Sequence, residues 1–334
     1  MTTADLHATS RVGDSLSRRI IARLGDPRTV RALALASVVC YALLVLTGGA
    51  VRLTGSGLGC ADWPECFQGH LVASASFHPL VEFTNRVVTI AVSVVTVIAF
   101  LSAVALRPRR RDLVGLGGAL IAGLIAQIIL GGIVVLTKLN PYLVALHFVL
   151  TLVVLAAALV MYHLARTYET HREPLVRSDV VWLARLVVGT LCVLILAGTI
   201  VTGAGPHAGG KGAKRIPIAF RDIAELHSTI ALFLIGCTLA SLFALHVAKA
   251  PARTQRVART MLEVLFIQGT LGYTQYFLHD ASVVIEFHLA GATAAWIAAV
   301  TFYLSLHRHP EPVRADKIAA PAQASGAVRV GVTT

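Results

Sequence analysis

Charged side chains are scarce in this sequence. They make up 14% of the 334 residues, whereas 56% of the residues are hydrophobic; an average soluble domain has about 25% charged residues. So few ionised groups cannot cover the surface of a water-soluble particle of this size, and the apolar excess must face lipid. The composition therefore excludes a soluble globular protein, and it excludes disordered and collagen-like chains for the same reason.

A basic patch of the kind that binds nucleic acid is also lacking. The chain has 29 Lys and Arg residues against 17 acidic ones and a formal net charge of +12. Nucleic-acid binding needs such residues clustered on one folded face, but here they stand between apolar runs. We therefore expect the lipid bilayer, and no nucleic acid, as the partner of this surface.

Apolar runs separated by charged residues predict an all-α membrane protein with eight transmembrane helices. The seventh run is the weakest because Glu263 stands at its start. The predicted spans are 32–51, 87–106, 113–137, 142–165, 186–206, 226–248, 264–278 and 287–306.

The basic residues predict the orientation of these spans. Most lie before the first span, in the even-numbered connections and after the last span, and such positive charge is retained on the cytoplasmic side. The chain is therefore expected in the cell (plasma) membrane as a multi-pass protein with both termini in the cytoplasm. A smaller set lies in or beside the outward connections, namely Arg52, Arg86, Lys138, Lys211, Lys214, Arg215 and Arg221.

Cysteine is rare, and two of the five cysteines fall in one predicted outward loop, 52–79. An oxidising compartment and a loop containing glycine and proline favour a disulfide between Cys60 and Cys66. Two free thiols are the alternative. A zinc site is less favoured because no second pair of ligands follows at a suitable spacing.

The chain contains an internal repeat. Gln127 is followed by Leu130-Gly131 and then by His147, and the same spacing recurs in Gln268, Leu271-Gly272 and His288. Two further pairs match, namely Thr54-Gly55-Ser56-Gly57 with Thr202-Gly203-Ala204-Gly205, and Glu82 to Asn85 with Glu225 to His227. Because each copy has four spans, the repeat is parallel and predicts two pseudo-symmetric four-helix bundles. The predicted division is tail 1–30, bundle 31–166, linker 167–185, bundle 186–308 and tail 309–334.

The matched polar residues enter the even-numbered spans from outside and predict a polar layer near the outer face. Ionisable groups at membrane depth usually mark a functional site, although a single histidine at a helix start is more often only hydrogen-bonded. Two opposed histidines in an apolar four-helix slot suit haem, whereas a bare zinc or copper ion would need more ligands. The residues in the layer are Glu82, Asn85, His147, His227 and His288.

These elements together resemble the haem A synthase family, whose members convert haem O to haem A for cytochrome oxidase. The resemblance covers about residues 32–306. It rests on the run from Gly49 to Gly57 that leads to Cys60 and Cys66, on Glu82-Phe83-Thr84-Asn85-Arg86, on Gln127 to His147, on Thr202 to His207, and on His227 and His288.

The resemblance implies a division of labour between the two halves. His227 and His288 would bind a haem b cofactor as iron ligands, and the N-terminal half would hold the substrate haem O through the iron ligand His147. Glu82 resembles the family's catalytic carboxylate. The implied chemistry oxidises a porphyrin methyl group twice, and loss of water from the resulting gem-diol leaves a formyl group. The implied partners are the enzyme that supplies haem O, an electron acceptor and, as an open interpretation, a second copy of the chain in a homo-oligomer.

One residue departs from the family pattern. The family commonly has Glu-x-x-His-Arg entering the second helix, and here Asn85 replaces that histidine. The iron of the substrate haem would then be five-coordinate, bound by water, or bound by another group such as His78. An open face would suit a site through which substrate and product exchange.

Local spacing gives further expectations for this site. Glu82 and Asn85 stand about one helical turn apart and address one pocket face. A carboxylate there can accept a proton or stabilise a carbocation that develops at the methyl carbon. The alternative is an interfacial Glu82 paired with Arg86 or Arg52. Glu225 is displaced by one position and receives no catalytic role. The basic residues expected to meet haem propionates are Arg52, Arg86, Lys214, Arg215 and Arg221.

Two other functions compete with this interpretation. A dihaem electron-transfer cytochrome would have the same fold and ligands, but it would gain from two six-coordinate irons, and it gives Glu82 no task. A small-molecule transporter would need broken helices or charges at the bilayer midplane, whereas the polar layer here lies near one face.

Overall fold

The computed structural model describes residues 18–167, 173–207, 209–210, 213–279 and 281–308. Within these ranges the chain is mainly helical, and the predicted tails 1–30 and 309–334 fall largely outside them. The long helices are α2 (Pro27–Leu53), α3 (Phe77–Ala105), α4 (Arg111–Leu136), α5 (Pro141–Leu164), α6 (Ser178–Ala204), α7 (Phe220–Val247), α8 (Ala252–Phe277) and α9 (Ser282–Ser305).

Local sequence fixes where two of these helices begin. The Asp26 side chain accepts a hydrogen bond from the Arg28 backbone N–H before α2, and Asn140 accepts one from Tyr142 before α5. In both cases a proline occupies the first turn, where its missing N–H costs nothing. Cap and proline together therefore set the starts of α2 and α5.

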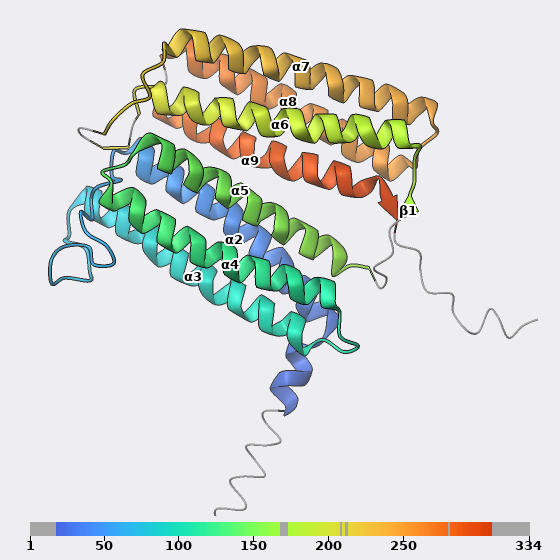
Figure 1. Ribbon diagram of the computed structural model, residues 1–334, viewed down its shortest axis with the longest axis horizontal. Helices are drawn as coiled ribbons and strands as arrows, with labels where there is room; N and C mark the ends of the chain where they lie inside the picture. The colour runs from blue at the N-terminus through green and yellow to red at the C-terminus, as the bar shows by residue number, and fades with distance from the viewer. Residues whose placement is uncertain (1–17, 168–172, 208, 211–212, 280, 309–334) are drawn as a thin grey trace, which may run out of the picture.

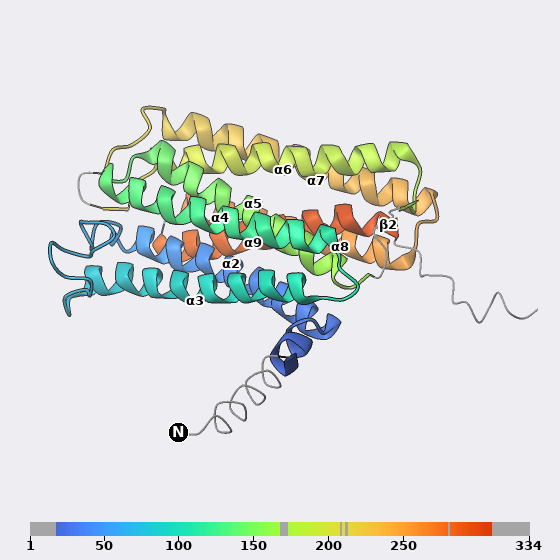
Figure 2. The same cartoon turned by 60° about the horizontal axis from the view of Figure 1, so that its bottom comes forward.

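The helices pack as two groups of four. α2 contacts α3 and α5, and α4 contacts α3 and α5, so that these helices form a ring; α6, α7, α8 and α9 form a second ring in the same way. The rings meet where α9 contacts α2 and α5, and where α5 contacts α6. Figure 1 shows the two groups side by side, and Figure 2 shows them from another angle.

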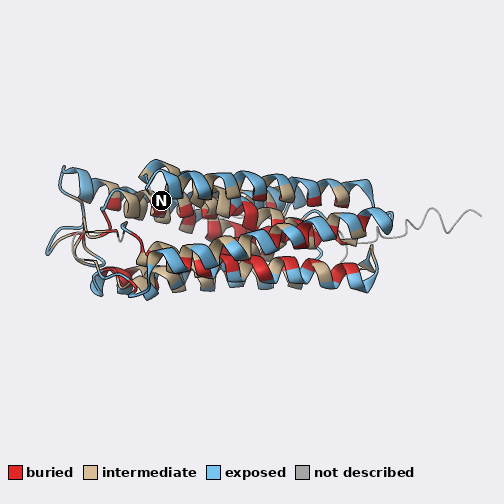
Figure 3. Cartoon of the chain, turned by 90° about the horizontal axis from the view of Figure 1, so that it is seen from above, coloured by how far each residue is buried: buried red, intermediate tan, exposed pale blue. Residues whose placement is uncertain are grey.

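Apolar side chains cover the outside of both groups. Large hydrophobic residues such as Leu43, Ile90, Phe233 and Phe243 are exposed, and the buried residues gather between the helices (Figure 3). Seven of the helices in the described part of the chain are long and apolar enough to cross a membrane. α8, which contains the seventh predicted span, is not among them. The first half of α8 carries charged residues, and Gln268 and Gln275 make its second half more polar.

Several predicted boundaries were wrong. α3 begins ten residues before the apolar run predicted to start at 87, because its first turns contain the charged residues Glu82 and Arg86 and so lie outside that run. His78 accordingly lies in the first turn of a helix and not in the outward loop 52–79. α6 begins at Ser178, which shortens the predicted linker 167–185.

A short ribbon that the sequence did not predict joins this linker to the end of α9. Strand β1 (Glu173–Pro174) pairs antiparallel with β2 (His307–Arg308), and the Leu175 N–H donates to the Leu306 carbonyl at 2.8 Å. The ribbon is too short for a period-2 hydrophobic pattern to reveal it. It lies at the end of the helices opposite to the loop between α2 and α3 (Figure 1).

Candidate functional site

Two histidines from α7 and α9 face each other in the C-terminal half. The ring centroids of His227 and His288 are 6.4 Å apart. His227 Nδ1 lies 3.1 Å from the Leu194 carbonyl oxygen; a hydrogen bond there leaves Nε2 available to a metal. Two metal–imidazole bonds of about 2 Å each, plus the distance from each nitrogen to its ring centre, span about 6 Å. The two rings therefore have the spacing that a single metal ion between them requires.

The N-terminal half places His147 in the same surroundings as His288. The Gln127 side chain donates to the His147 carbonyl at 3.1 Å, and Gln268 donates to the His288 carbonyl at 2.8 Å. Nδ1 of both histidines is buried with no hydrogen-bond partner among the described residues. The residues matched in sequence thus make matching contacts in space.

Each of these three histidines packs on a glycine of the preceding helix. A Cβ atom on that glycine would lie closer to the imidazole Cε1 than in ordinary van der Waals contact. A larger residue there would therefore displace the ring. The pairs are Gly198 with His227 at 3.0 Å, Gly272 with His288 at 3.1 Å and Gly131 with His147 at 3.3 Å.

The fourth position of this pattern holds Asn85 and Ala50 in place of histidine and glycine. The Thr54 hydroxyl donates to the Ala50 carbonyl at 2.7 Å, as the Thr202 hydroxyl does to the Gly198 carbonyl at 2.7 Å, which identifies Ala50 as the counterpart of Gly198. Asn85 Oδ1 accepts a hydrogen bond from Thr47 at 2.7 Å. Asn85 thus replaces a histidine, and the Ala50 methyl group on α2 occupies the space in which the histidine ring would pack.

Asn85 and His147 lie on opposite sides of their ring. α3 and α5 are separated by α2 and α4, in the same way that α7 and α9 are separated by α6 and α8. The N-terminal half therefore presents an imidazole on one side and an amide on the other, at the positions where the C-terminal half presents two imidazoles.

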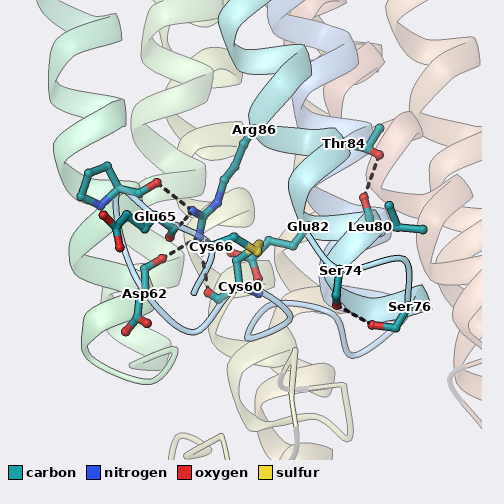
Figure 4. Close-up of a disulfide and its surroundings, with 11 residues drawn as sticks. Cys60, Asp62, Glu65, Cys66, Ser74, Ser76, Leu80, Glu82, Thr84 and Arg86 are labelled. Carbon is teal, nitrogen blue, oxygen red and sulfur yellow. Dashed lines mark hydrogen bonds and ion pairs between the residues drawn. A yellow bond between two sulfur atoms is a disulfide. The ribbon is translucent and has the colours of Figure 1, made fainter. Parts of the chain in front are cut away.

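Glu82 lies in the first turns of α3, beneath the loop that contains Cys60 and Cys66. These cysteines form a disulfide, as the sequence predicts. The Glu82 residue is only 5% exposed, and its Oε2 accepts a hydrogen bond from the Cys60 backbone N–H at 2.8 Å (Figure 4). Its Oε1 pairs with Arg86 Nη2, also at 2.8 Å.

Arg86 ties this carboxylate to the rest of the loop. Both of its terminal nitrogens donate to loop carbonyl oxygens, those of Cys60, Asp62, Pro64 and Glu65. The ion pair is the one expected in the alternative interpretation of Glu82, and it belongs to a largely buried network. The disulfide loop, Arg86 and Glu82 therefore form a single hydrogen-bonded unit.

The same loop extends to the neighbourhood of His147. A Cβ atom on Gly132 would meet the Trp63 indole, its nearest atom 2.6 Å away, so that indole lies against α4 beside Gly131, which supports His147. Neither Trp63 nor the glycines against the histidines were among the predicted site residues. Extending the repeat by four residues before Thr54 and Thr202 would have revealed the pair formed by Ala50 and Gly198.

Arg52 joins the two halves where α2 and α6 end. Its Nε donates to the His207 carbonyl at 2.7 Å, and its Nη2 donates to the Thr202 carbonyl at 2.8 Å. The sequence predicted Arg52 as a partner of a haem propionate. The contacts show that part of its guanidinium holds the end of α6, which leaves only the remaining N–H groups for an anion.

His78 and Glu225 both have polar partners. His78 Nδ1 lies 3.0 Å from the Ser56 hydroxyl. Glu225, to which the sequence assigns no catalytic role, pairs with Arg221 at 2.9 Å, and its side chain is 66% exposed.

Glu286 was missed because the eighth span was predicted to start at 287. Its Oε2 is buried without a hydrogen-bond partner among the described residues. The carboxylate lies against Gly49 of α2, at the contact between the two helical groups. A carboxylate inside an apolar run is itself a signal for a site, and that signal was available in the sequence.

These features fit a planar metal cofactor in the C-terminal half. Two imidazoles are spaced for one ion, the Nδ1 contact of His227 leaves Nε2 available, and glycines make room for both rings. A cluster of three or more His, Cys, Asp or Glu side chains that could hold a bare metal ion is absent from the described residues. This donor set suits axial ligation better than a tetrahedral zinc site.

Comparison with known proteins gives a consistent result. The family model described as "Cytochrome oxidase assembly protein" matches residues 31–210. The haem A synthase of Listeria monocytogenes is 29% identical over 195 residues, which is 54% of this chain and 59% of the relative. The haem A synthase of Lysinibacillus sphaericus is 32% identical over 135 residues, 40% of this chain and 44% of the relative.

A third relative extends the match slightly. The haem A synthase of Staphylococcus haemolyticus is 26% identical over 203 residues, 59% of this chain and 66% of the relative. The chain thus spans somewhat more than half the length of the Listeria monocytogenes relative. Because the family model covers more than half of the chain, the chain belongs to the family of cytochrome oxidase assembly proteins that includes the haem A synthases.

Proposed function

We propose that this protein is a haem A synthase, an oxidoreductase that oxidises a methyl group of haem O to the formyl group of haem A. The observation that carries the proposal is the asymmetry of the two halves. One half has two facing imidazoles, His227 and His288, and the other has one imidazole, His147, with an amide opposite and the buried carboxylate of Glu82 at the same end. A permanent cofactor and an exchanging substrate would need these two different sites.

The proposed membrane arrangement includes α8 as an eighth span. α8 has 26 residues, as α4 does, and it carries Gln268 and Gly272 at the positions of Gln127 and Gly131. Its exposed Arg253, Arg256 and Arg259 lie in the first turns, where long basic side chains reach the interface. The halves are then pseudo-symmetric, both termini are cytoplasmic, and the haem sites face outward.

In the C-terminal half, His227 and His288 would hold haem b through their Nε2 atoms. Haem b supplies one-electron transfer. The protein's contribution is to orient the imidazoles: the Leu194 carbonyl fixes the ring of His227, and Gln268 fixes the backbone that carries His288. The apolar helices around the pair exclude water.

In the N-terminal half, Glu82 would accept a proton as the methyl group is oxidised. The Cys60 N–H and Arg86 hold its two oxygens in place, and because each carboxylate oxygen can accept more than one hydrogen bond, the group keeps acceptor capacity. Haem O would be bound through His147. The N–H groups of Arg52 that Thr202 and His207 leave free would bind a propionate.

The proposal is tested by extracting the pigment bound to the purified full-length protein after co-expression with an enzyme that makes haem O. We expect haem A in the extract together with haem b. A dihaem electron carrier would yield two unmodified haems and no haem A, and that result would contradict the proposal. The host needs to lack its own haem A synthase, so that any haem A comes from this chain.

The Asn85 side of the substrate site predicts a distinct spectroscopic result. With haem O bound and reduced, we expect the wild-type protein to bind carbon monoxide, because Asn is a poor iron ligand and His78 lies against Ser56. The double variant Asn85→His with Ala50→Gly supplies both the imidazole and the space that Gly198 provides for His227. Carbon monoxide binding, measured by difference spectroscopy, is expected to be lost in this variant.

The single variants serve as controls for this measurement. Ala50→Gly alone should still bind carbon monoxide, and Asn85→His alone should lose only part of the signal because the Ala50 methyl group obstructs the ring. A wild-type protein loaded with haem O that binds no carbon monoxide would show that another group closes this face.

A further inference from the structure

Two adjoining cavities lie at the end of α6 farthest from the disulfide loop. The first, of about 300 Å³, is bounded by the β1–β2 ribbon and the first turns of α6, with Ser178, Arg185 and His307 among its lining residues. The second, of about 550 Å³, runs between α6 and α7. Trp182 and Arg185 line both cavities, so the two adjoin at these side chains. Together they are called the groove here, with polar residues beside the ribbon and mostly apolar residues between α6 and α7.

The polar end carries a cation that is free to meet an anion. The guanidinium carbon of Arg185 lies 4.7 Å from the centroid of the Trp182 ring, and the Trp182 residue is 65% exposed. None of the ion pairs formed within the described part of the chain includes Arg185. Ser178 and His307 provide further polar groups at the same end.

The apolar part has the length of one membrane leaflet. It follows α6 from Trp182 to Val193, which corresponds to about 16 Å at the rise of an α-helix, and one leaflet of hydrocarbon is about 15 Å thick. Gly189 lines this groove, and a Cβ atom there would have no heavy atom within 4 Å, so the space beside it is open. Ile230 and Phe233 of α7 form the opposite wall.

We propose that this groove binds one anionic phospholipid. Its phosphate lies against Arg185 and one acyl chain follows the channel between α6 and α7. An exposed tryptophan beside a basic residue is typical of the membrane interface, and basic pockets at transmembrane helices bind anionic head groups. The polar end of the groove lies at the opposite end of the helices from the loop between α2 and α3 (Figure 1), and its apolar end reaches Val193, which precedes Leu194, the residue that contacts His227.

Quenching of Trp182 fluorescence by brominated lipid tests this site. The full-length protein is reconstituted into phosphatidylcholine vesicles that contain a fixed small fraction of either phosphatidylglycerol or phosphatidylcholine with brominated acyl chains. The chain has three tryptophans, and subtracting the signal of a Trp182→Phe variant isolates Trp182. Because both leaflets have the same composition, the result does not depend on the orientation of the protein.

We expect brominated phosphatidylglycerol to occupy the site about fivefold more strongly than brominated phosphatidylcholine, the preference that one basic side chain near an anionic lipid provides. Arg185→Gln should abolish the preference. The matched control is Arg177→Gln, because Arg177 is exposed, pairs with Asp179 and lines neither cavity. Gly189→Leu should fill the groove and reduce quenching by both lipids, whereas Gly115→Leu, at another glycine with nothing within 4 Å, should not.

Three results would overturn the proposal. They are equal quenching by the two brominated lipids in the wild type, a preference that survives Arg185→Gln, and a Gly115→Leu variant that behaves as Gly189→Leu does. Thermal unfolding followed by circular dichroism identifies any variant whose loss of quenching comes from loss of fold. Arg185→Lys keeps the charge and should keep the preference, and a loss of preference in a folded Arg185→Lys protein would also contradict the proposal.

Discussion

Replacing Glu82 with glutamine is expected to lower the rate of haem A formation by at least about 100-fold, the lower end of what a positioned proton acceptor contributes. Glutamine keeps the size of the side chain and an oxygen that can accept from the Cys60 N–H, but it cannot take up a proton. The loop is therefore expected to keep its fold while the chemistry is lost. The measurement is the ratio of haem A to haem O in extracted pigment at a fixed time after co-expression.

Glu225→Gln is the matched control for this substitution. Glu225 forms an ion pair with an arginine four residues away, as Glu82 does, but its side chain is 66% exposed, against 7% for that of Glu82. We expect haem A formation at the wild-type rate in this variant. The b-type absorption should be unchanged in both variants, since neither residue contacts His227 or His288. Wild-type turnover by Glu82→Gln would assign the proton transfer to another group.

The matching surroundings of His147 and His288 were predictable, because the repeat places both histidines at the same distance along the chain from a glutamine. The twenty residues from Gln127 to His147 and from Gln268 to His288 carry a hydrogen bond from an amide to a backbone carbonyl, which holds neighbouring helices in register. The disulfide was predictable for a similar reason, because both cysteines lie in one short loop. Such features depend on residues that are close along the chain or repeated along it.

The network around Glu82 was less accessible to sequence reasoning. Its contacts join the first turns of α3 to backbone groups of the loop more than twenty residues earlier. Every residue type has these backbone groups, so the sequence does not indicate which of them form a contact. The predicted role of Arg52 was incomplete for the same reason, since its partners are carbonyl oxygens about 150 residues away. Hydropathy also placed the start of the second span later than the start of α3, because the charged residues Glu82 and Arg86 lower the hydropathy of the first turns, although the two neutralise each other within one helical turn.

His288→Ala is expected to remove the low-spin b-type spectrum of the purified protein. The ring of His288 is one of two that face each other at 6.4 Å, and alanine leaves only His227 to bind an iron. Loss of an outer contact to a metal ligand already costs about 10- to 100-fold in affinity, so loss of the ligand itself should cost at least that. The reduced-minus-oxidised difference spectrum measures the loss, and His227→Ala should give the same result.

The internal repeat supplies the control for this prediction. His147→Ala removes an imidazole with the same glycine neighbour and the same glutamine contact to its backbone, so its effect on packing should be similar. If the halves divide the work as proposed, His147→Ala loses bound haem O but keeps the b-type spectrum, whereas His288→Ala does the reverse. Equal loss of the b-type spectrum in both variants would mean that the two irons are not held separately, and it would contradict the assignment of cofactor and substrate to different halves.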